Sequence, residues 1–174
     1  MQSVENCRIG ILGLGYVGFP LAIEFGKQFE TIGFDIDAER VHSLRRGEFP
    51  QSQRLTISDA PQDLETCNVF IVTVPTPVDE ANRPDFEPLL SASKTIARLL
   101  KQGDIVIYES TVYPGCTEDE CGPILEKAWM KLADLAASTM SQFSARLAPA
   151  PAATPFTAAI TGTGKWWIAS ASGL

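Results

Sequence analysis

The 174-residue sequence is poor in histidine and cysteine, the side chains that most often bind zinc. It contains one histidine, and its four cysteines, Cys7, Cys67, Cys116 and Cys121, have no C-x-x-C spacing. This pattern argues against a zinc site and favours reduced, mostly structural thiols. Cys116 invites interpretation as a nucleophile, but no base lies near it in the sequence, so we do not expect that role.

Clustered positive charge and long hydrophobic runs are also absent. The net charge is −7, and no Lys/Arg cluster is larger than Arg45-Arg46, so no nucleic-acid partner is expected. No apolar run approaches the ~20 residues of a membrane span. Met1 to Cys7 has neither the basic flank nor the apolar core of a signal peptide. We therefore expect a cytoplasmic protein without a membrane partner.

What the sequence does contain is a glycine-rich stretch near its N-terminus. Arg8 to Leu12 is a short apolar run that predicts a buried strand, and G-x-G-x-x-G follows it at positions 13 to 18. From Tyr16 to Phe29, apolar residues recur every four positions, as in a helix packed on a sheet. Strand, glycine turn and helix in this order indicate a dinucleotide-binding turn. The G-K-[ST] ending of a mononucleotide P-loop is missing.

Each position of the turn has an expected role. Gly13 would allow the tight turn, Gly15 the close approach of a pyrophosphate, and Gly18 close packing of helix on strand. The backbone amides of Tyr16 and Val17 would face the phosphates at the positive end of the helix. The alternative is a purely structural strand–helix turn.

An acidic residue follows at the spacing that such a site requires. Asp35 ends a predicted strand at 31–34 and lies 20 residues after Gly15. It would accept hydrogen bonds from ribose hydroxyls and repel a 2′-phosphate, which favours NAD over NADP. Its alternative role is a cap for the next helix. Arg40 could lie over the adenosine ribose or the pyrophosphate, or be a solvated helix charge.

Strands and helices alternate through the first 127 residues. Beyond Asp35 the sequence predicts a helix at 38–46 capped by Asp37, a short strand at 55–57, a buried strand at 69–74, a helix at 84–100, a strand at 104–108, and a helix from Thr117, its N-cap, to about Leu135. Such alternation predicts an α/β fold, a Rossmann-like and mostly parallel sheet with helices on both faces. His42 is expected at the surface.

The carboxyl ends of parallel strands share one edge, so site residues should come from that edge. We expect contributions from the glycine turn, Asp35, and the segments 75–77 and 109–111. Thr111 is a candidate for a site contact by position alone, and the alternative for its segment is a polar turn that ends the strand.

The tail from Ala136 onward is rich in Ala, Ser, Thr and Pro and has few charges. Such a composition cannot easily bury enough surface to offset the entropy of ordering. We therefore divide the chain into a nucleotide-binding domain at 1–127 and an irregular, disordered tail at 128–174. The strand at 104–108 would then have a bare edge.

Four stretches of the sequence together resemble one known family. Residues 11–22 and 33–37 are similar to the NAD-binding domain of the UDP-glucose/GDP-mannose dehydrogenases. Residues 72–79 and 108–117 resemble the UDP-N-acetylhexosamine 6-dehydrogenases of bacterial surface-polysaccharide synthesis, the Vi-polysaccharide type. The resemblance covers roughly Arg8 to Lys127.

The resemblance implies an oxidoreductase that uses two NAD per turnover to oxidise the C6 alcohol of a UDP-sugar to a carboxylate. Six residues match positions where the family contacts NAD: Tyr16, Val17, Asp35, Arg40, Thr76 and Thr111. The resemblance also gives Thr111 a supporting role in ordering a water near the reacting carbon. No catalytic residue is assigned in this chain.

The sequence departs from the family in two places. Residues 47–63 are fewer than the family has there, so the third strand is expected to form poorly and the adenine side of the site to suffer. The resemblance ends near Lys127, before the part of the family that carries the catalytic cysteine, a lysine, an asparagine and most sugar contacts. A frameshift or truncation is our hypothesis for the tail.

Two functions therefore remain open. The chain is either the NAD-binding portion of a nucleotide-sugar 6-dehydrogenase or an NAD-binding fragment without turnover, which we favour for the isolated chain. A third possibility, a different short NAD-dependent reductase, predicts a Tyr-x-x-x-Lys pair in the second half, and none is present.

Overall fold

A parallel sheet forms the centre of the structure, a computed structural model that describes residues 6–47, 54–78, 83–110, 112, 115–128, 130, 157–162 and 165–170. Its elements, in chain order, are β1 (Arg8–Leu12), α1 (Gly18–Phe25), β2 (Glu30–Phe34), α2 (Ala38–Arg46), β3 (Leu55–Ser58), the 3-10 helix η2 (Pro61–Thr66), β4 (Val69–Val72), α3 (Glu87–Ala97), β5 (Ile105–Tyr108), the π-helical turn η3 (Thr117–Cys121), β6 (Thr157–Gly162) and β7 (Lys165–Ser170).

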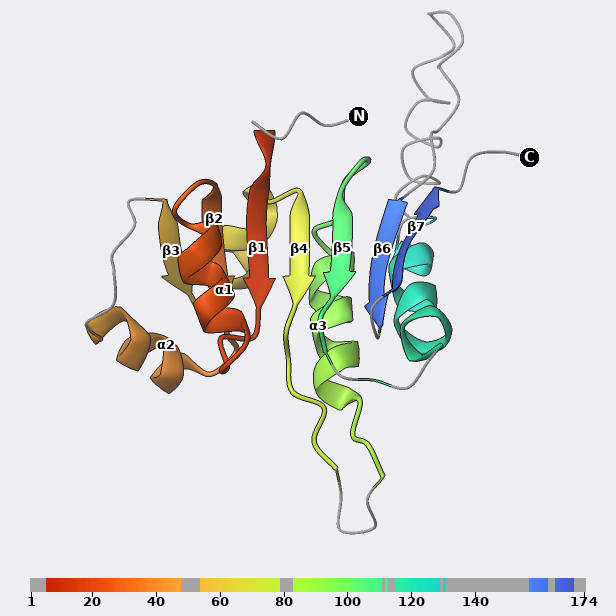
Figure 1. Cartoon of the computed structure of the whole chain (residues 1–174), viewed down its shortest axis with the longest axis horizontal. Helices are drawn as coiled ribbons and strands as arrows, with labels where there is room; N and C mark the ends of the chain where they lie inside the picture. Colours follow the sequence, from red (N-terminus) through yellow and green to blue (C-terminus); the bar gives the residue numbers. More distant parts are fainter. Residues whose placement is uncertain are drawn as a thin grey trace, which may run out of the picture.

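The strands lie side by side in the order β3-β2-β1-β4-β5-β6-β7 (Figure 1). The pairs from β3 through β6 are all parallel, and β7 is antiparallel to β6. The order reverses at β1, because β2 and β4 pair with its two sides. Such a reversal leaves a crevice outside the carboxyl ends of the two central strands, where ligands bind in open α/β sheets.

Two hydrophobic cores cover the two faces of the sheet. On one face α1 and α2 contribute Ala22 and Val41, which pack with Ile9, Ile11 and Ile57 of the strands. On the other face η2, α3 and η3 contribute side chains such as Leu64, Leu89, Ile96 and Cys121, which pack with Phe70, Val72 and Val106. The predicted α/β fold, with helices on both faces of a mostly parallel sheet, is therefore confirmed.

The third strand is better formed than expected. β3 pairs with β2 at all four of its residues, from Thr31–Leu55 to Phe34–Ser58. Arg45 of α2 fixes it further, because its Nε donates to the carbonyl of Ile57 at 2.9 Å. The short connection before β3 therefore does not prevent pairing, and the expectation of a poorly formed strand is wrong.

Two other details of the sequence prediction need correction. The strand predicted at 69–74 ends at Val72. The N-cap of the turn at Thr117 is Cys116, and Thr117 instead donates from its hydroxyl to the Glu118 carboxylate at 2.9 Å. Asp37, by contrast, caps α2 as predicted, since its Oδ1 accepts from the amides of Glu39 and Arg40.

The expected bare edge of β5 is occupied. Ile107 and Tyr108 pair with Ala159 and Ile160 of β6, a segment of the tail that we expected to be irregular. An edge strand exposes unpaired N–H and C=O groups, which favour the addition of any extended segment that can reach them. Thr, Ile and Trp residues, which suit strands, are frequent in β6 and β7. The expectation of a bare edge and of irregular structure at these segments is therefore wrong, and the division at Lys127 stays a prediction.

Candidate dinucleotide-binding site

A cavity of about 580 Å³ lies at the carboxyl edge of the sheet, at the point where the strand order reverses. The glycine turn, the end of β2 and the start of α3 form its walls. Its lining residues are Leu12, Gly13, Gly15, Phe34, Asp35, Ile36, Asp37, Arg40, Val74, Pro75, Asp85, Glu87, Pro88, Ser91, Ala92 and Thr95. Five predicted contributors therefore meet at this cavity, namely Gly13, Gly15, Asp35, Arg40 and Pro75 of the segment 75–77.

Gly13 makes the turn that leads out of β1. Its φ is +96°, a conformation that residues with a side chain rarely adopt. A Cβ at this position would also lie 3.0 Å from the amide nitrogen of Val74. The amide of Gly13 donates to the carbonyl of Phe34 at 2.8 Å, which ties the turn to the end of β2.

The positions of Gly15 and Gly18 favour glycine for opposite reasons. A Cβ at Gly15 would meet nothing within 4 Å, so this position is open to the cavity. A Cβ at Gly18 would collide with the carbonyl of Gly13 and the hydroxyl of Thr73. Gly18 therefore serves the packing of α1 on the sheet, whereas Gly15 keeps space free for a group outside the protein.

The amides that follow Gly15 are available to a ligand. Within the described part of the chain, no hydrogen bond occupies the N–H groups of Tyr16 and Val17. Val17 is the N-cap of α1 and makes no side-chain capping bond, and Tyr16 is 92% exposed. Free amides at a helix N-terminus attract anions such as phosphate.

Asp35 supports the glycine turn as well as facing the cavity. Its Oδ2 accepts from the amide of Leu14 at 2.8 Å, and its Oδ1 accepts from the amide of Asp37 at 3.0 Å. Its side chain is only 14% exposed. The alternative that Asp35 caps α2 is wrong, because Asp37 holds that position. Each carboxylate oxygen keeps a lone pair for a further donor.

Arg40 binds the other backbone group of the same residue, Leu14. Its Nε donates to the carbonyl of Leu14 at 2.6 Å and lies 3.9 Å from Oδ2 of Asp35. The Leu14 residue is thus held at its amide by an acid and at its carbonyl by a base. Arg40 is half exposed and lines the cavity, so it is more than a solvated helix charge.

The ends of β4 and β5 contribute less than expected. Thr76 is half-buried and does not line the cavity, and Thr111 lies outside the described residues. Ser110 donates from its hydroxyl to the carbonyl of Val74 at 2.7 Å, which links the two strand ends. Thr73, which sequence analysis did not single out, is buried here; the signal was its position as the first hydroxyl after the apolar run of β4.

The cysteines behave as structural residues. Cys67, Cys116 and Cys121 are buried and Cys7 is half-buried, and all four are reduced thiols outside any disulfide. Burial raises the pKa of Cys67 to about 11 and also raises the pKa of Cys121, which keeps these thiols protonated and unreactive. No group of three metal-binding side chains occurs among the described residues. His42 is exposed, as predicted.

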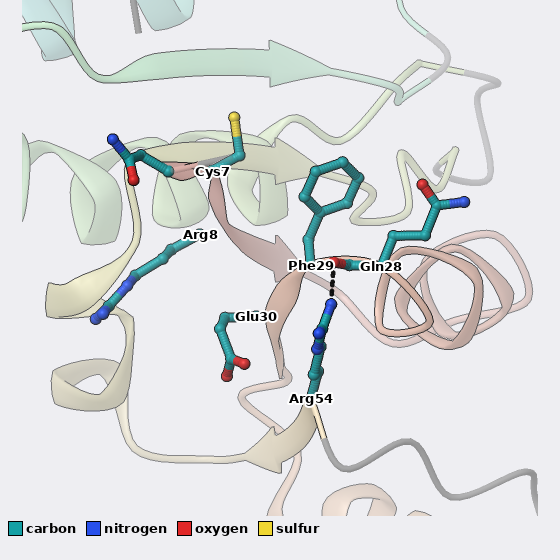
Figure 2. Close-up of a pocket in the computed structure, with 7 residues that line it drawn as sticks. Cys7, Arg8, Gln28, Phe29, Glu30 and Arg54 are labelled. Carbon is teal, nitrogen blue, oxygen red and sulfur yellow. Dashed lines mark hydrogen bonds between the residues drawn. The ribbon is translucent and has the colours of Figure 1, made fainter. Parts of the chain in front are cut away.

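A second cavity lies at the opposite edge of the sheet. It measures about 710 Å³ and is lined by Asn6, Cys7, Arg8, Gln28, Phe29, Glu30 and Arg54 (Figure 2). Arg54 donates to the carbonyl of Gln28 at 2.6 Å. Because Arg8 and Glu30 begin β1 and β2, this cavity faces the amino ends of the strands, away from the glycine turn. It does not correspond to the ligand crevice of this kind of sheet.

The strand order, the glycine turn between β1 and α1, and the acid at the end of β2 together define a dinucleotide-binding Rossmann domain. Sequence comparison identifies its kind. The sequence model of the UDP-glucose/GDP-mannose dehydrogenase family, NAD-binding domain, matches residues 7–151. The chain belongs to this family, and NAD is therefore the cofactor that its domain binds.

Individual relatives agree with this assignment. The chain is 51% identical over 134 residues to a UDP-N-acetyl-D-glucosamine 6-dehydrogenase of Pseudomonas aeruginosa, covering 71% of this chain and 32% of that protein. It is 44% identical over 137 residues to the enzyme of the same name from Salmonella typhi, covering 73% and 32%. The chain thus spans about a third of the length of these relatives.

A solved structure shares the fold. The UDP-D-ManNAc dehydrogenase of Pyrococcus horikoshii superimposes with a TM-score of 0.66 at 28% sequence identity, covering 88% of this chain and 35% of that one. Within the described residues, no helix is long and apolar enough to cross a membrane.

Proposed function

We propose that this chain is the NAD-binding part of a UDP-N-acetylhexosamine 6-dehydrogenase, which oxidises the C6 alcohol of a UDP-sugar to a carboxylate. Two relatives that carry the name UDP-N-acetyl-D-glucosamine 6-dehydrogenase support the substrate class. The observation that carries the binding role is the open space at Gly15, bordered by the free amides of Tyr16 and Val17 and by Asp35.

The geometry fits NAD at each of these points. The amides of Tyr16 and Val17 would donate to the pyrophosphate, for which the missing side chain at Gly15 leaves room. Asp35 would accept from the adenosine ribose with the lone pairs that Leu14 and Asp37 leave free.

Other residues of this chain would orient the cofactor. Arg40, held over the carbonyl of Leu14, would place its outer nitrogens near the adenosine ribose or the pyrophosphate. The family resemblance adds Thr76 and Thr111 as further contacts to NAD. NAD, when bound, supplies the nicotinamide that accepts a hydride.

A second function of another class is NAD binding without turnover by this chain alone. This second function is favoured because the chain spans only about a third of the length of its relatives. The buried state of Cys67, Cys116 and Cys121 adds to this, because none of these thiols can serve as a nucleophile at the cavity.

The cytoplasmic location and the absence of a nucleic-acid partner stay proposals that rest on composition.

The binding role is tested by titration calorimetry of the 174-residue chain with NAD. We expect saturable binding that Asp35→Ala abolishes or weakens at least tenfold, because it removes the ribose acceptor and one bond of the turn. Asp59→Ala is the matched control, since Asp59 directly follows β3 at the same edge of the sheet but does not line the cavity. Failure of the wild-type chain to bind NAD would refute the proposal.

The two functions are separated by a turnover assay. NADH formation is followed with UDP-N-acetylglucosamine and UDP-N-acetylgalactosamine as substrates. No NADH from a chain that binds NAD supports the fragment without turnover, whereas steady NADH production by this chain alone refutes it.

A further inference from the structure

Thr73, a buried residue at the carboxyl end of β4, forms hydrogen bonds to the glycine turn. Thr73 directly follows β4 and is 8% exposed. Its hydroxyl donates to the carbonyl of Gly13 at 2.7 Å, with a longer contact of 3.1 Å to the carbonyl of Leu12. Its amide donates to the same Leu12 carbonyl at 2.8 Å. Thr73 thus extends the pairing of β4 with β1 past the last residue of β1.

These bonds fix Gly13 from two strands. Its amide is held by the carbonyl of Phe34 at the end of β2, and its carbonyl is held by the hydroxyl of Thr73 next to β4. The same hydroxyl lies too close to the position that a Cβ of Gly18 would take, so it also limits how closely α1 approaches the sheet. One hydroxyl therefore connects β4, the turn and the first residue of α1.

We infer that Thr73 is the positioning residue of the phosphate-binding turn. It does not line the cavity; it acts through Gly13, which it holds so that Gly15 and the next two amides keep facing the pyrophosphate. If the turn is already ordered before NAD binds, binding costs less conformational entropy and the affinity for NAD is higher. The inference rests on the proposed function, since it takes this turn to be the pyrophosphate site.

The test compares Thr73→Val with the wild-type chain. Valine has the shape of threonine but leaves the Gly13 carbonyl without its donor. We expect the Kd values of NAD and ADP-ribose, measured by calorimetry, to rise by about five- to tenfold, the effect of one hydrogen bond. The Kd of adenosine, measured by ligand-observed NMR, should stay within about twofold, because adenosine has no phosphate to meet the turn.

Two further variants separate positioning from a merely structural role. Thr73→Ser keeps the hydroxyl and should restore the NAD affinity to within about twofold of wild type. Thr31→Val removes an equally buried hydroxyl at the other end of the sheet, where Thr31 donates to the carbonyl of Phe29 at 3.0 Å. Thr31→Val should lower the melting temperature without changing the Kd of NAD.

The outcomes are distinguishable. If the wild-type chain does not bind NAD, the proposed function fails, and the inference with it. If the wild type binds and Thr73→Val binds NAD equally well, or loses adenosine as strongly as NAD, the inference alone is refuted. Should Thr73→Val not fold, Thr73→Ala takes its place with the same expectations, because it removes the hydroxyl without placing a methyl group against Gly18.

Discussion

The second and third glycines of the turn should respond to alanine in opposite ways. Gly15 has open space where a Cβ would stand, and its φ is not positive, so Gly15→Ala introduces no strain. Gly18→Ala would press a methyl group against the carbonyl of Gly13 and the hydroxyl of Thr73. We therefore expect Gly15→Ala to impair binding and Gly18→Ala to impair folding.

The magnitudes follow from these contacts. Overpacking of a tight site costs about 1–3 kcal/mol, which lowers the melting temperature of a chain of this size by roughly 2–12 °C. Gly15→Ala should leave stability unchanged or raise it by about 0.5 kcal/mol through the unfolded state. In the complex its methyl group would occupy the space of the pyrophosphate and remove one charged hydrogen bond, about 1.5–3 kcal/mol, so NAD affinity should fall roughly 10- to 150-fold.

Thermal melts with and without NAD measure both effects in one experiment. Without NAD, Gly15→Ala should melt with the wild type and Gly18→Ala below it. NAD at a concentration that saturates the wild type should raise the melting temperature of the wild type. The same concentration should raise the melting temperature of Gly15→Ala much less, because a weaker ligand stabilises the folded state less. A Gly15→Ala variant that gains as much from NAD as the wild type would refute the assignment of the open space to the pyrophosphate.

Three further predictions concern charge and thiols. Burial raises the pKa of Asp104 in the folded chain above its value in the unfolded chain. The contribution of Asp104 to the free energy of unfolding is therefore fully present below its unfolded pKa and is lost as pH rises through its folded pKa. Asp104→Asn should remove this pH dependence from the free energy of unfolding, measured by urea unfolding at a series of pH values. A disulfide reagent at pH 8 should label Cys7 much faster than Cys67, whose pKa of about 11 leaves little thiolate; equal rates would contradict the buried packing. Asp35→Asn should narrow the preference for NAD over NADP, measured by calorimetry, because it removes the charge that repels a 2′-phosphate beside Arg40.

The fold was accessible from the sequence wherever a local pattern decides the structure. The apolar runs of β1 and β4 and the capped helix α2 were placed within a residue or two, because each depends on its own burial or capping. The glycine motif and Asp35 were found because their spacing is fixed by the β1-α1-β2 unit, with the glycines in its first turn and the acid after its second strand. Both therefore point to the carboxyl edge of the sheet, where the cavity lies.

Pairing between distant segments was not accessible in this way. β3 forms because β2 offers it an open edge, although the chain before it is short. β6 adds to β5 for the same reason, although the Ala-, Ser-, Thr- and Pro-rich composition of the tail as a whole favoured irregular structure. Thr73 was missed because its importance comes from the carbonyl of Gly13, 60 residues earlier in the chain.

Asp35 shows how a binding residue can be part of the scaffold that it serves. The spacing rule assigns its carboxylate to a ribose, but both oxygens already accept backbone amides, those of Leu14 and Asp37. The first of these bonds holds the same turn that Thr73 holds from β4, and Arg40 holds it from α2. The turn is therefore supported by side chains from three elements, so its shape is set by the fold before a cofactor arrives, and loss of Asp35 must disturb the pyrophosphate site as well as the ribose contact.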